Sequence, residues 1–233
     1  MFTNSEAFGA GWRILKDRVG FLIGVHFVAL AVQCAPQLLM GDSPGMKALV
    51  VIGSLLLSFV TALGLVRIGL NLVDGQEAGY PDLFSCAHLV FGYLVATLLH
   101  TILIVACPLL VVGLGFYSGV LTENLSSRVI VLICAVPLVL SGLYIGAQFG
   151  LWPYLMVDCQ IGPVEAMKTS SRMTRGTRGR LMIFYLLSIV AILFGLLAIV
   201  VGSLVAYAVI TVAGASIYRQ ILSHRPLDQG TTL

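Results

Sequence analysis

Long apolar runs separated by short polar segments dominate the chain. A helix that crosses a hydrocarbon core of roughly 30 Å needs about 20 apolar residues. Four runs have at least that length, and a fifth run, from Leu181 to Tyr218, contains no charged residue. As one helix the fifth run would be about 57 Å long, so we expect two passes with a turn near Val201, Gly202 and Ser203. The pattern predicts six membrane spans, at about residues 19–40, 48–73, 88–113, 129–157, 181–201 and 203–221.

Shorter, more polar segments precede three of these spans, at about residues 5–18, 80–87 and 163–176. We expect each to form a short helix at the membrane surface. In the last, Pro163 suits the first helical position and Gly176 is placed to end the helix. Lys168, Arg172 and Arg175 follow Glu165 at intervals of three or four residues, so they share one face. This predicts an amphipathic helix with a basic side.

The composition excludes a water-soluble domain. The chain has 233 residues, 59% of them hydrophobic and 10% charged, with a mean hydropathy of +1.03. A soluble domain carries roughly 25% charged residues, because its surface must be solvated. We therefore expect residues 1–233 to form a single integral membrane domain, an all-α polytopic bundle. The five cysteines are scattered and odd in number, which argues against a disulfide framework.

The positions of the basic residues predict the orientation in the membrane. Six spans place Lys47 and Arg128 on one side. Cytoplasmic loops carry an excess of Lys and Arg, so we expect both termini to be cytoplasmic. The other eleven basic residues fall on that side: Arg13, Lys16, Arg18, Arg67, Lys168, Arg172, Arg175, Arg178, Arg180, Arg219 and Arg225.

A short internal repeat links the two halves of the chain. Val73-Asp74-x-Gln76 matches Val157-Asp158-x-Gln160, and each is followed by a proline, a short segment and a new span. The N-terminal segment shows the same order without a preceding span. Internal similarity at a long period is evidence for a repeated architecture. We therefore predict three copies of one unit, each an interfacial helix followed by a helical hairpin.

One set of positions recurs in a known group of proteins: Asp158, Glu165-Ala166, Ser170, Gly176 and Tyr218-Arg219, with Pro81 to Phe84 as the counterpart in the first half. With these positions the chain resembles, over nearly its whole length, a broad group of bacterial six-span membrane proteins of unknown function. This group includes the membrane domain fused to some glycerophosphoryl diester phosphodiesterases. The resemblance implies a six-span fold in the bacterial inner membrane. The resemblance is to the membrane domain and not to the phosphodiesterase domain, so we expect no hydrolase activity to carry over.

Polar side chains within the spans have two interpretations. His26, Gln33, His100 and Gln148 could line a transport path, since intramembrane polar groups are costly and often functional. They could equally form hydrogen bonds between helices. No Asp, Glu, Lys or Arg lies in the middle of a predicted span, which favours helix packing. The four histidines lack ligand spacing, so we expect no metal and no cofactor.

Three glycines and one loop complete the candidate features. Gly142, Gly146 and Gly150 recur every four residues on one face of the fourth span, a spacing that lets helices approach closely. The loop Gly41 to Gly45 matches the G-x-S-x-G pattern of serine hydrolases. That pattern requires a strand-to-helix elbow, whereas this segment is predicted to be a turn between spans.

The basic segment leaves three interpretations of its role: it fixes orientation, it contacts lipid head groups, or it docks a cytoplasmic partner. Orientation explains the charge but not the helix signals, so we favour contact with anionic lipids at the cytoplasmic face.

The sequence predicts a non-enzymatic membrane protein that organises, senses or handles lipids or assists a membrane partner, without binding nucleic acid. A transporter or channel for a small or lipid-like solute is the alternative, and an intramembrane enzyme comes third. The candidate head-group contacts are Lys168, Arg172, Arg175, Arg178 and Arg180.

Overall fold

The computed structural model describes residues 3–39, 43–117, 127–197 and 199–224, and this part of the chain contains helices and no strands. The all-helical prediction is confirmed. The elements, in chain order, are α1 (Asn4–Asp17), α2 (Val19–Cys34), η1 (Ala35–Leu39), α3 (Pro44–Val73), η2 (Tyr80–Leu83), η3 (Ala87–Leu89), α4 (Val90–Tyr117), α5 (Ser127–Phe149), α6 (Trp152–Cys159), α7 (Pro163–Met173), α8 (Arg178–Leu197) and α9 (Ile199–His224).

Five helical segments of the described chain are long and apolar enough to cross a membrane. Their length and apolar composition indicate a membrane protein. The helix α5 corresponds to the remaining predicted span, but many side chains in its first half lie outside the described part of the chain. The count of six spans therefore stays a prediction. The five segments are Val19–Leu38, Pro44–Val73, Tyr80–Ala106, Arg178–Leu197 and Gly202–His224.

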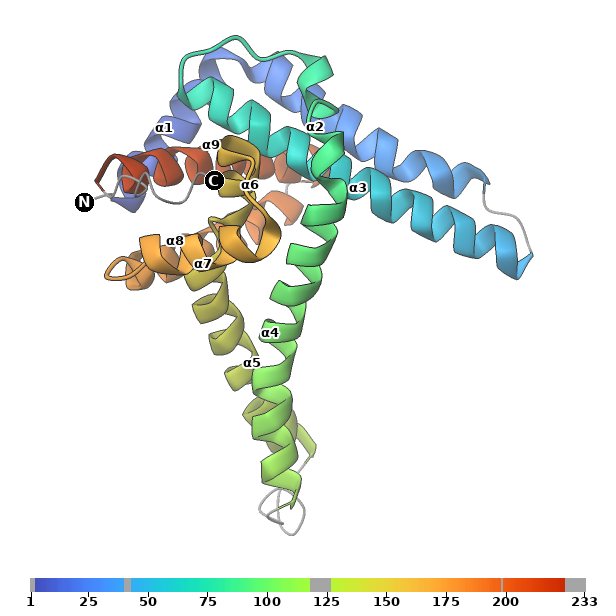
Figure 1. Cartoon of the computed structure of the whole chain (residues 1–233), viewed down its shortest axis with the longest axis vertical. Coiled ribbons are helices and arrows are strands. Elements are labelled where there is room, and N and C mark those ends of the chain that lie inside the picture. The colour runs from blue at the N-terminus through green and yellow to red at the C-terminus, as the bar shows by residue number, and fades with distance from the viewer. Residues whose placement is uncertain (1–2, 40–42, 118–126, 198, 225–233) are drawn as a thin grey trace.

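Helical hairpins extend from a common base. We use the term base for α1, η2, η3, α6 and α7, together with the ends of the long helices that pack on them. The hairpins are α2–α3, α4–α5 and α8–α9, in each of which consecutive helices pack against each other. Figure 1 shows that α2–α3 and α4–α5 leave the base in different directions, so that their far ends lie well apart. The base is thus the place where the hairpins meet.

Burial follows the same division between base and hairpins. The buried residues of α3 lie almost entirely in its second half, and most of those of α9 lie in its C-terminal half. In contrast, Leu38 near the far end of the first hairpin is 89% exposed, and Leu197 at the end of α8 is 81% exposed. Such apolar surface needs a lipid environment or a partner. The folded core therefore sits in the base, and the far halves of the hairpins present apolar side chains outward.

Close backbone contact holds α1 against α9 within the base. A Cβ atom added at Gly11 would lie 2.7 Å from the carbonyl oxygen of Val209 and 3.3 Å from the amide of Ala213. Only glycine permits this approach without a shift of the backbone. The first predicted interfacial helix, at 5–18, is thereby placed across the last span as α1.

The fourth predicted span is interrupted. The run 129–157 was expected to be one helix, but α5 ends at Phe149 and α6 starts at Trp152. Pro153 lies in the first turn of α6, where a proline needs no backbone partner. The apolar pattern continues through the break, so hydropathy did not indicate it.

Two further boundaries differ from the predictions. The helix α9 starts at Ile199, before the turn expected near residues 201–203. Gly202 lies inside α9, where its backbone packs closely against Gly195 of α8. A Cβ atom added at Gly195 would lie 2.7 Å from the carbonyl oxygen of Gly202. The segment predicted as a helix at 80–87 forms the short 3-10 turns η2 and η3. In the first of them, the Asp82 carboxylate caps the turn by accepting from the Gly79 amide at 2.9 Å.

Candidate functional site

An arginine at the base is shared by two carboxylates. The Arg219 guanidinium on α9 donates from Nε and Nη2 to the carboxylate of Asp74, at 2.9 and 2.6 Å. It also donates from Nη1 and Nη2 to the carboxylate of Asp158, at 2.7 and 3.0 Å. Both contacts are bidentate, which is the strongest geometry for an arginine–carboxylate pair. We refer to Asp74, Asp158, Tyr218 and Arg219 as the ion-pair cluster.

The ion-pair cluster joins three segments that are far apart in the sequence. Asp74 is the residue after α3, Asp158 lies near the end of α6, and Tyr218 and Arg219 lie on α9. The Tyr218 hydroxyl adds a hydrogen bond by donating to Asp158 Oδ2 at 2.8 Å. The side chains of Arg219, Asp74 and Asp158 are only 27%, 29% and 20% exposed. The cluster thus ties α3, α6 and α9 together in a partly water-excluded place.

The sequence contained part of this cluster. The repeat placed Asp74 and Asp158 in equivalent positions, and the family resemblance singled out Asp158 and Tyr218-Arg219. Neither observation predicted that both carboxylates meet the same guanidinium. Cys159, next to Asp158, has its Sγ 3.8 Å from the Tyr218 hydroxyl. Burial raises the pKa of this thiol, and the nearby Asp158 carboxylate adds to the effect.

The buried side of α7 closes the break between α5 and α6. Ser170 is fully buried, and its hydroxyl accepts from the Leu151 amide at 3.2 Å and donates to the Gln148 carbonyl at 3.3 Å. The Thr174 hydroxyl donates to the same carbonyl at 3.0 Å. These bonds satisfy backbone groups that the interrupted helix leaves without a helical partner. The Ser170 position of the family resemblance therefore has a structural role in this chain.

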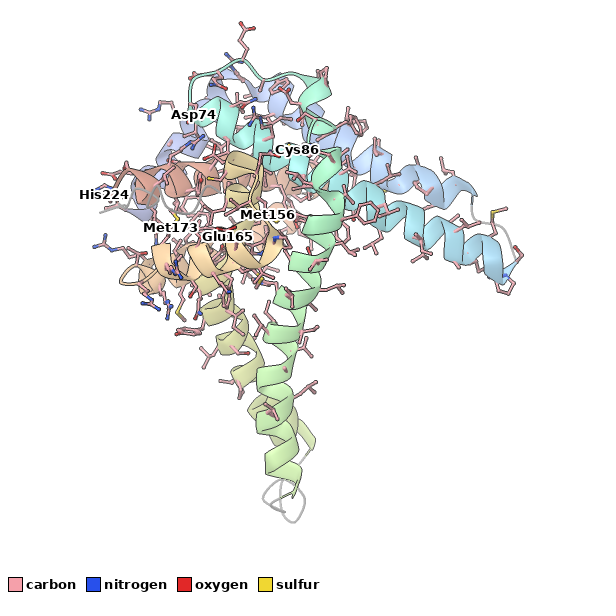
Figure 2. All side chains as sticks on the ribbon, in the orientation of Figure 1. Asp74, Cys86, Met156, Glu165, Met173 and His224 are labelled. Atoms are coloured by element: carbon pink, nitrogen blue, oxygen red, sulfur yellow. The ribbon has the colours of Figure 1, made fainter. Side chains whose placement is uncertain are left out.

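The other side of α7 carries the predicted basic face. Lys168 and Arg172 are exposed, and so is Arg175 just beyond the helix, whereas Ala166, Met167, Ser170 and Met173 are buried. Gly176 adopts a positive φ of 83° in the turn that follows, a conformation that favours glycine. The helix ends at Met173, slightly before the predicted boundary at residue 176. Figure 2 shows nitrogen-bearing side chains gathered around this region, close to the labelled Met173.

Arg178 and Arg180 lie apart from that face, at the start of α8, and both are half-buried. The Arg178 Nη1 donates to the Tyr144 hydroxyl on α5 at 2.7 Å. Its Nε is buried and has no hydrogen-bond partner among the described residues. The Arg180 carbonyl accepts from the Asn4 side chain at 3.0 Å. The five candidate head-group residues thus divide into three exposed ones and two that also pack within the base.

The four intramembrane polar residues lie at separate contacts. Gln33 donates to Thr61 Oγ1 at 3.1 Å and joins α2 to α3, while Gln148 donates to Ser171 Oγ at 3.1 Å and joins α5 to α7. His26 Nδ1 lies 2.8 Å from the Leu22 carbonyl oxygen, one turn earlier in α2. The fourth, His100, contacts the rings of Phe149 and Trp152.

The glycine series contacts α8 over part of its length. A Cβ at Gly150 would collide with the Tyr185 hydroxyl, and one at Gly146 would just touch the Tyr185 ring. Gly142 has nothing within 4 Å of such an atom. Two of the three glycines therefore make room for an aromatic side chain of α8.

An apolar cavity of about 340 Å³ lies between α3, α4, α6, α8 and α9. Its volume is within the range typical of small-molecule sites. Leucine, isoleucine and phenylalanine side chains form much of the wall, and tyrosines bring hydroxyl groups to it. One wall residue, Tyr207, is 51% exposed, so the cavity reaches the surface of α9. The tyrosines of the wall are Tyr93, Tyr154, Tyr185 and Tyr207.

No protein family, curated protein or solved structure that was compared with this chain matches it. The resemblance to the six-span group therefore remains a prediction from the sequence.

Proposed function

We propose that the chain is a non-enzymatic protein of the bacterial inner membrane that organises or handles lipids from its cytoplasmic face. In this proposal the base lies in the head-group region and the hairpins enter the hydrocarbon core. The observation that carries it is the distribution of burial. Most of the core lies in the base, while hairpins that diverge expose many apolar side chains along their far halves (Figure 1). Lipid chains then fill the space between the hairpins.

The chemistry of the base supports its position at a lipid surface. The exposed Lys168, Arg172 and Arg175 suit an anionic leaflet, where each basic residue contributes about 1 kcal/mol. On α1, Trp12 is exposed and Lys16 lies over its ring, with Nζ 5.5 Å from the ring centroid. Tryptophan is enriched at membrane–water interfaces. Basic and aromatic groups are thus combined on the same part of the molecule.

The proposal includes six spans and a threefold repeat. A short helix or turn precedes each hairpin: α1 before α2–α3, η2 and η3 before α4–α5, and α7 before α8–α9. The equivalent residues Asp74 and Asp158 both contact Arg219, which lies near the end of the last hairpin. In this reading, each unit contributes one partner to the ion-pair cluster.

Transport of a small or lipid-like solute is the second candidate. Thr97 and His100 lie one turn apart on α4, and the Thr97 hydroxyl and His100 Nδ1 are buried with no hydrogen-bond partner among the described residues. Such groups would be satisfied by water or by a polar solute. His26 Nε2, on α2, is likewise buried without a partner among the described residues. However, Gln33 and Gln148 form hydrogen bonds between helices, so these polar groups do not form one continuous path, which favours the lipid proposal.

The test of the lipid proposal is the selectivity of the protein for anionic lipid. Spin-labelled phosphatidylglycerol and phosphatidylcholine are compared in reconstituted bilayers, and the motionally restricted fraction of each label is measured. We expect the wild type to favour phosphatidylglycerol. Replacing Lys168, Arg172 and Arg175 together with glutamine should bring the two lipids several-fold closer to equality, because about 1 kcal/mol is lost at each residue near the surface.

The control is Lys47→Gln, which removes an exposed charge near the start of α3, at the opposite end from the base. This variant should keep the selectivity of the wild type. Equal selectivity in the triple variant and the wild type, with both correctly inserted, would remove the support for a lipid-binding base.

A further inference from the structure

We infer that the cavity between α3, α4, α6, α8 and α9 holds one acyl chain of an anionic phospholipid, whose phosphate is bound by Arg178. This inference rests on the proposed function and extends it from a general lipid surface to a single lipid site. It combines an apolar cavity, an opening toward lipid and a positive charge on α8, three positions before the first α8 residue of the cavity wall.

The cavity wall suits a hydrocarbon chain. Leu65, Phe184 and Ile217 are among its apolar residues, and they come from different helices. The exposed Tyr207 places the opening on α9, part of a hairpin whose other helix, α8, exposes apolar side chains such as Leu186 and Leu193. A chain can therefore pass from bilayer to cavity without crossing water.

The head-group end is defined by Arg178. It precedes the wall residues Leu181 and Tyr185 by three and seven positions on α8, so the three side chains share one side of the helix. About 4.5 Å of helix axis separates Arg178 from Leu181. The Tyr144 hydroxyl holds Nη1, while Nε is buried without a partner among the described residues.

An unpaired buried donor is costly, and a charged one more so. A phosphate oxygen would satisfy it with a charge-assisted hydrogen bond, the type of contact for which guanidinium groups are suited. The charge complementarity therefore selects an anionic lipid over a neutral apolar molecule.

Native mass spectrometry of the detergent-purified full chain tests the inference. Protein is incubated with dioleoyl phosphatidylglycerol, with dioleoyl phosphatidylcholine, or with inorganic phosphate. We expect one phosphatidylglycerol molecule to be retained, phosphatidylcholine to be retained at least fivefold less, and phosphate to leave lipid retention unchanged. Retention of neither lipid, or displacement of the lipid by phosphate, would overturn the inference.

Matched variants locate the site. Ala62→Phe fills the cavity from α3 and should abolish lipid retention, whereas Ala31→Phe adds the same ring at an exposed position of α2 and should not. Arg178→Gln should remove the preference for phosphatidylglycerol, while Lys47→Gln, at an exposed position near the start of α3, should keep it. Equal retention by Ala62→Phe and Ala31→Phe, or an unchanged preference in Arg178→Gln, would contradict the site.

A measurement on the wild type avoids any dependence on how the variants fold. Phosphatidylglycerol with a diazirine at the end of one chain should crosslink to cavity-wall residues of α8 or α9. Crosslinks confined to residues outside the cavity wall would contradict the site. The proposed function fails separately, if the bilayer selectivity of the Lys168, Arg172 and Arg175 triple variant equals that of the wild type while one lipid is still retained in the cavity.

Discussion

Replacing Arg219 with methionine is expected to lower the free energy of unfolding by about 2–3 kcal/mol. The change leaves Asp74 and Asp158 facing each other without the guanidinium that now donates to both. Loss of one partner of a fully buried ion pair costs 3–5 kcal/mol, and the partial exposure of these side chains reduces the effect. For a chain of this size, the thermal midpoint should fall by roughly 5–10 °C, which a thermal-shift assay in detergent can measure.

The geometry of the ion-pair cluster also predicts that replacing its two carboxylates restores part of the stability lost in Arg219→Met. Adding Asp74→Asn and Asp158→Asn to Arg219→Met removes the unpaired charges, so part of the lost stability should return. Arg175→Met, at an exposed arginine of the base, should change the midpoint little. The account of the cluster is wrong if Arg219→Met behaves like Arg175→Met, or if the combined variant is less stable than Arg219→Met alone.

The second large effect is expected at Gly64, on the buried side of α3. A Cβ atom at this position would overlap the backbone of Leu83 in η2. Because the obstacle is backbone and not the end of a flexible side chain, η2 must move. We expect Gly64→Ala to destabilise the protein by about 3 kcal/mol, at the upper end of the usual overpacking cost, and to reduce the yield of folded protein.

Gly53 provides the matched control on the same helix. A Cβ there meets nothing within 4 Å, and alanine favours a helix over glycine by up to about 1 kcal/mol. Gly53→Ala should therefore leave the thermal midpoint unchanged or raise it slightly. If Gly64→Ala and Gly53→Ala shift the midpoint equally, η2 does not pack against α3 as described.

The long helices could be predicted from the sequence because their apolar length has one main structural solution in a membrane. The start of α7 could be predicted from Pro163, and the turn after it from Gly176. Hydropathy did not predict the break at Gly150 and Leu151, because its neighbours are as apolar as the helices on either side, and the one local signal was Pro153 in the first turn of α6. What stabilises the break is a pair of hydroxyls, Ser170 and Thr174, about 20 residues later in the chain.

The candidate site was harder to predict than the fold, because it is formed by contacts between segments that are distant in the sequence. Arg219 and Asp74 are 145 positions apart, and no local pattern links them. The repeat of Val-Asp-x-Gln marked Asp74 and Asp158 as equivalent before their shared partner was known, and the family resemblance marked Asp158 and Tyr218-Arg219. The cavity left no signal, because Tyr154, Tyr185 and Tyr207 lie on three separate segments and each one reads alone as an ordinary aromatic residue.

The orientation of the base gives the central claim its most direct test. Lys47→Cys and Arg175→Cys are each introduced into a version whose native cysteines are replaced by alanine. Both positions are exposed, one near the start of α3 and the other in the base. A membrane-impermeant maleimide is then applied to intact spheroplasts and to inverted membrane vesicles. We predict that position 47 is labelled in spheroplasts and position 175 only in inverted vesicles. Labelling of position 175 from outside intact spheroplasts would contradict a cytoplasmic base and, with it, the account of how the protein contacts lipids.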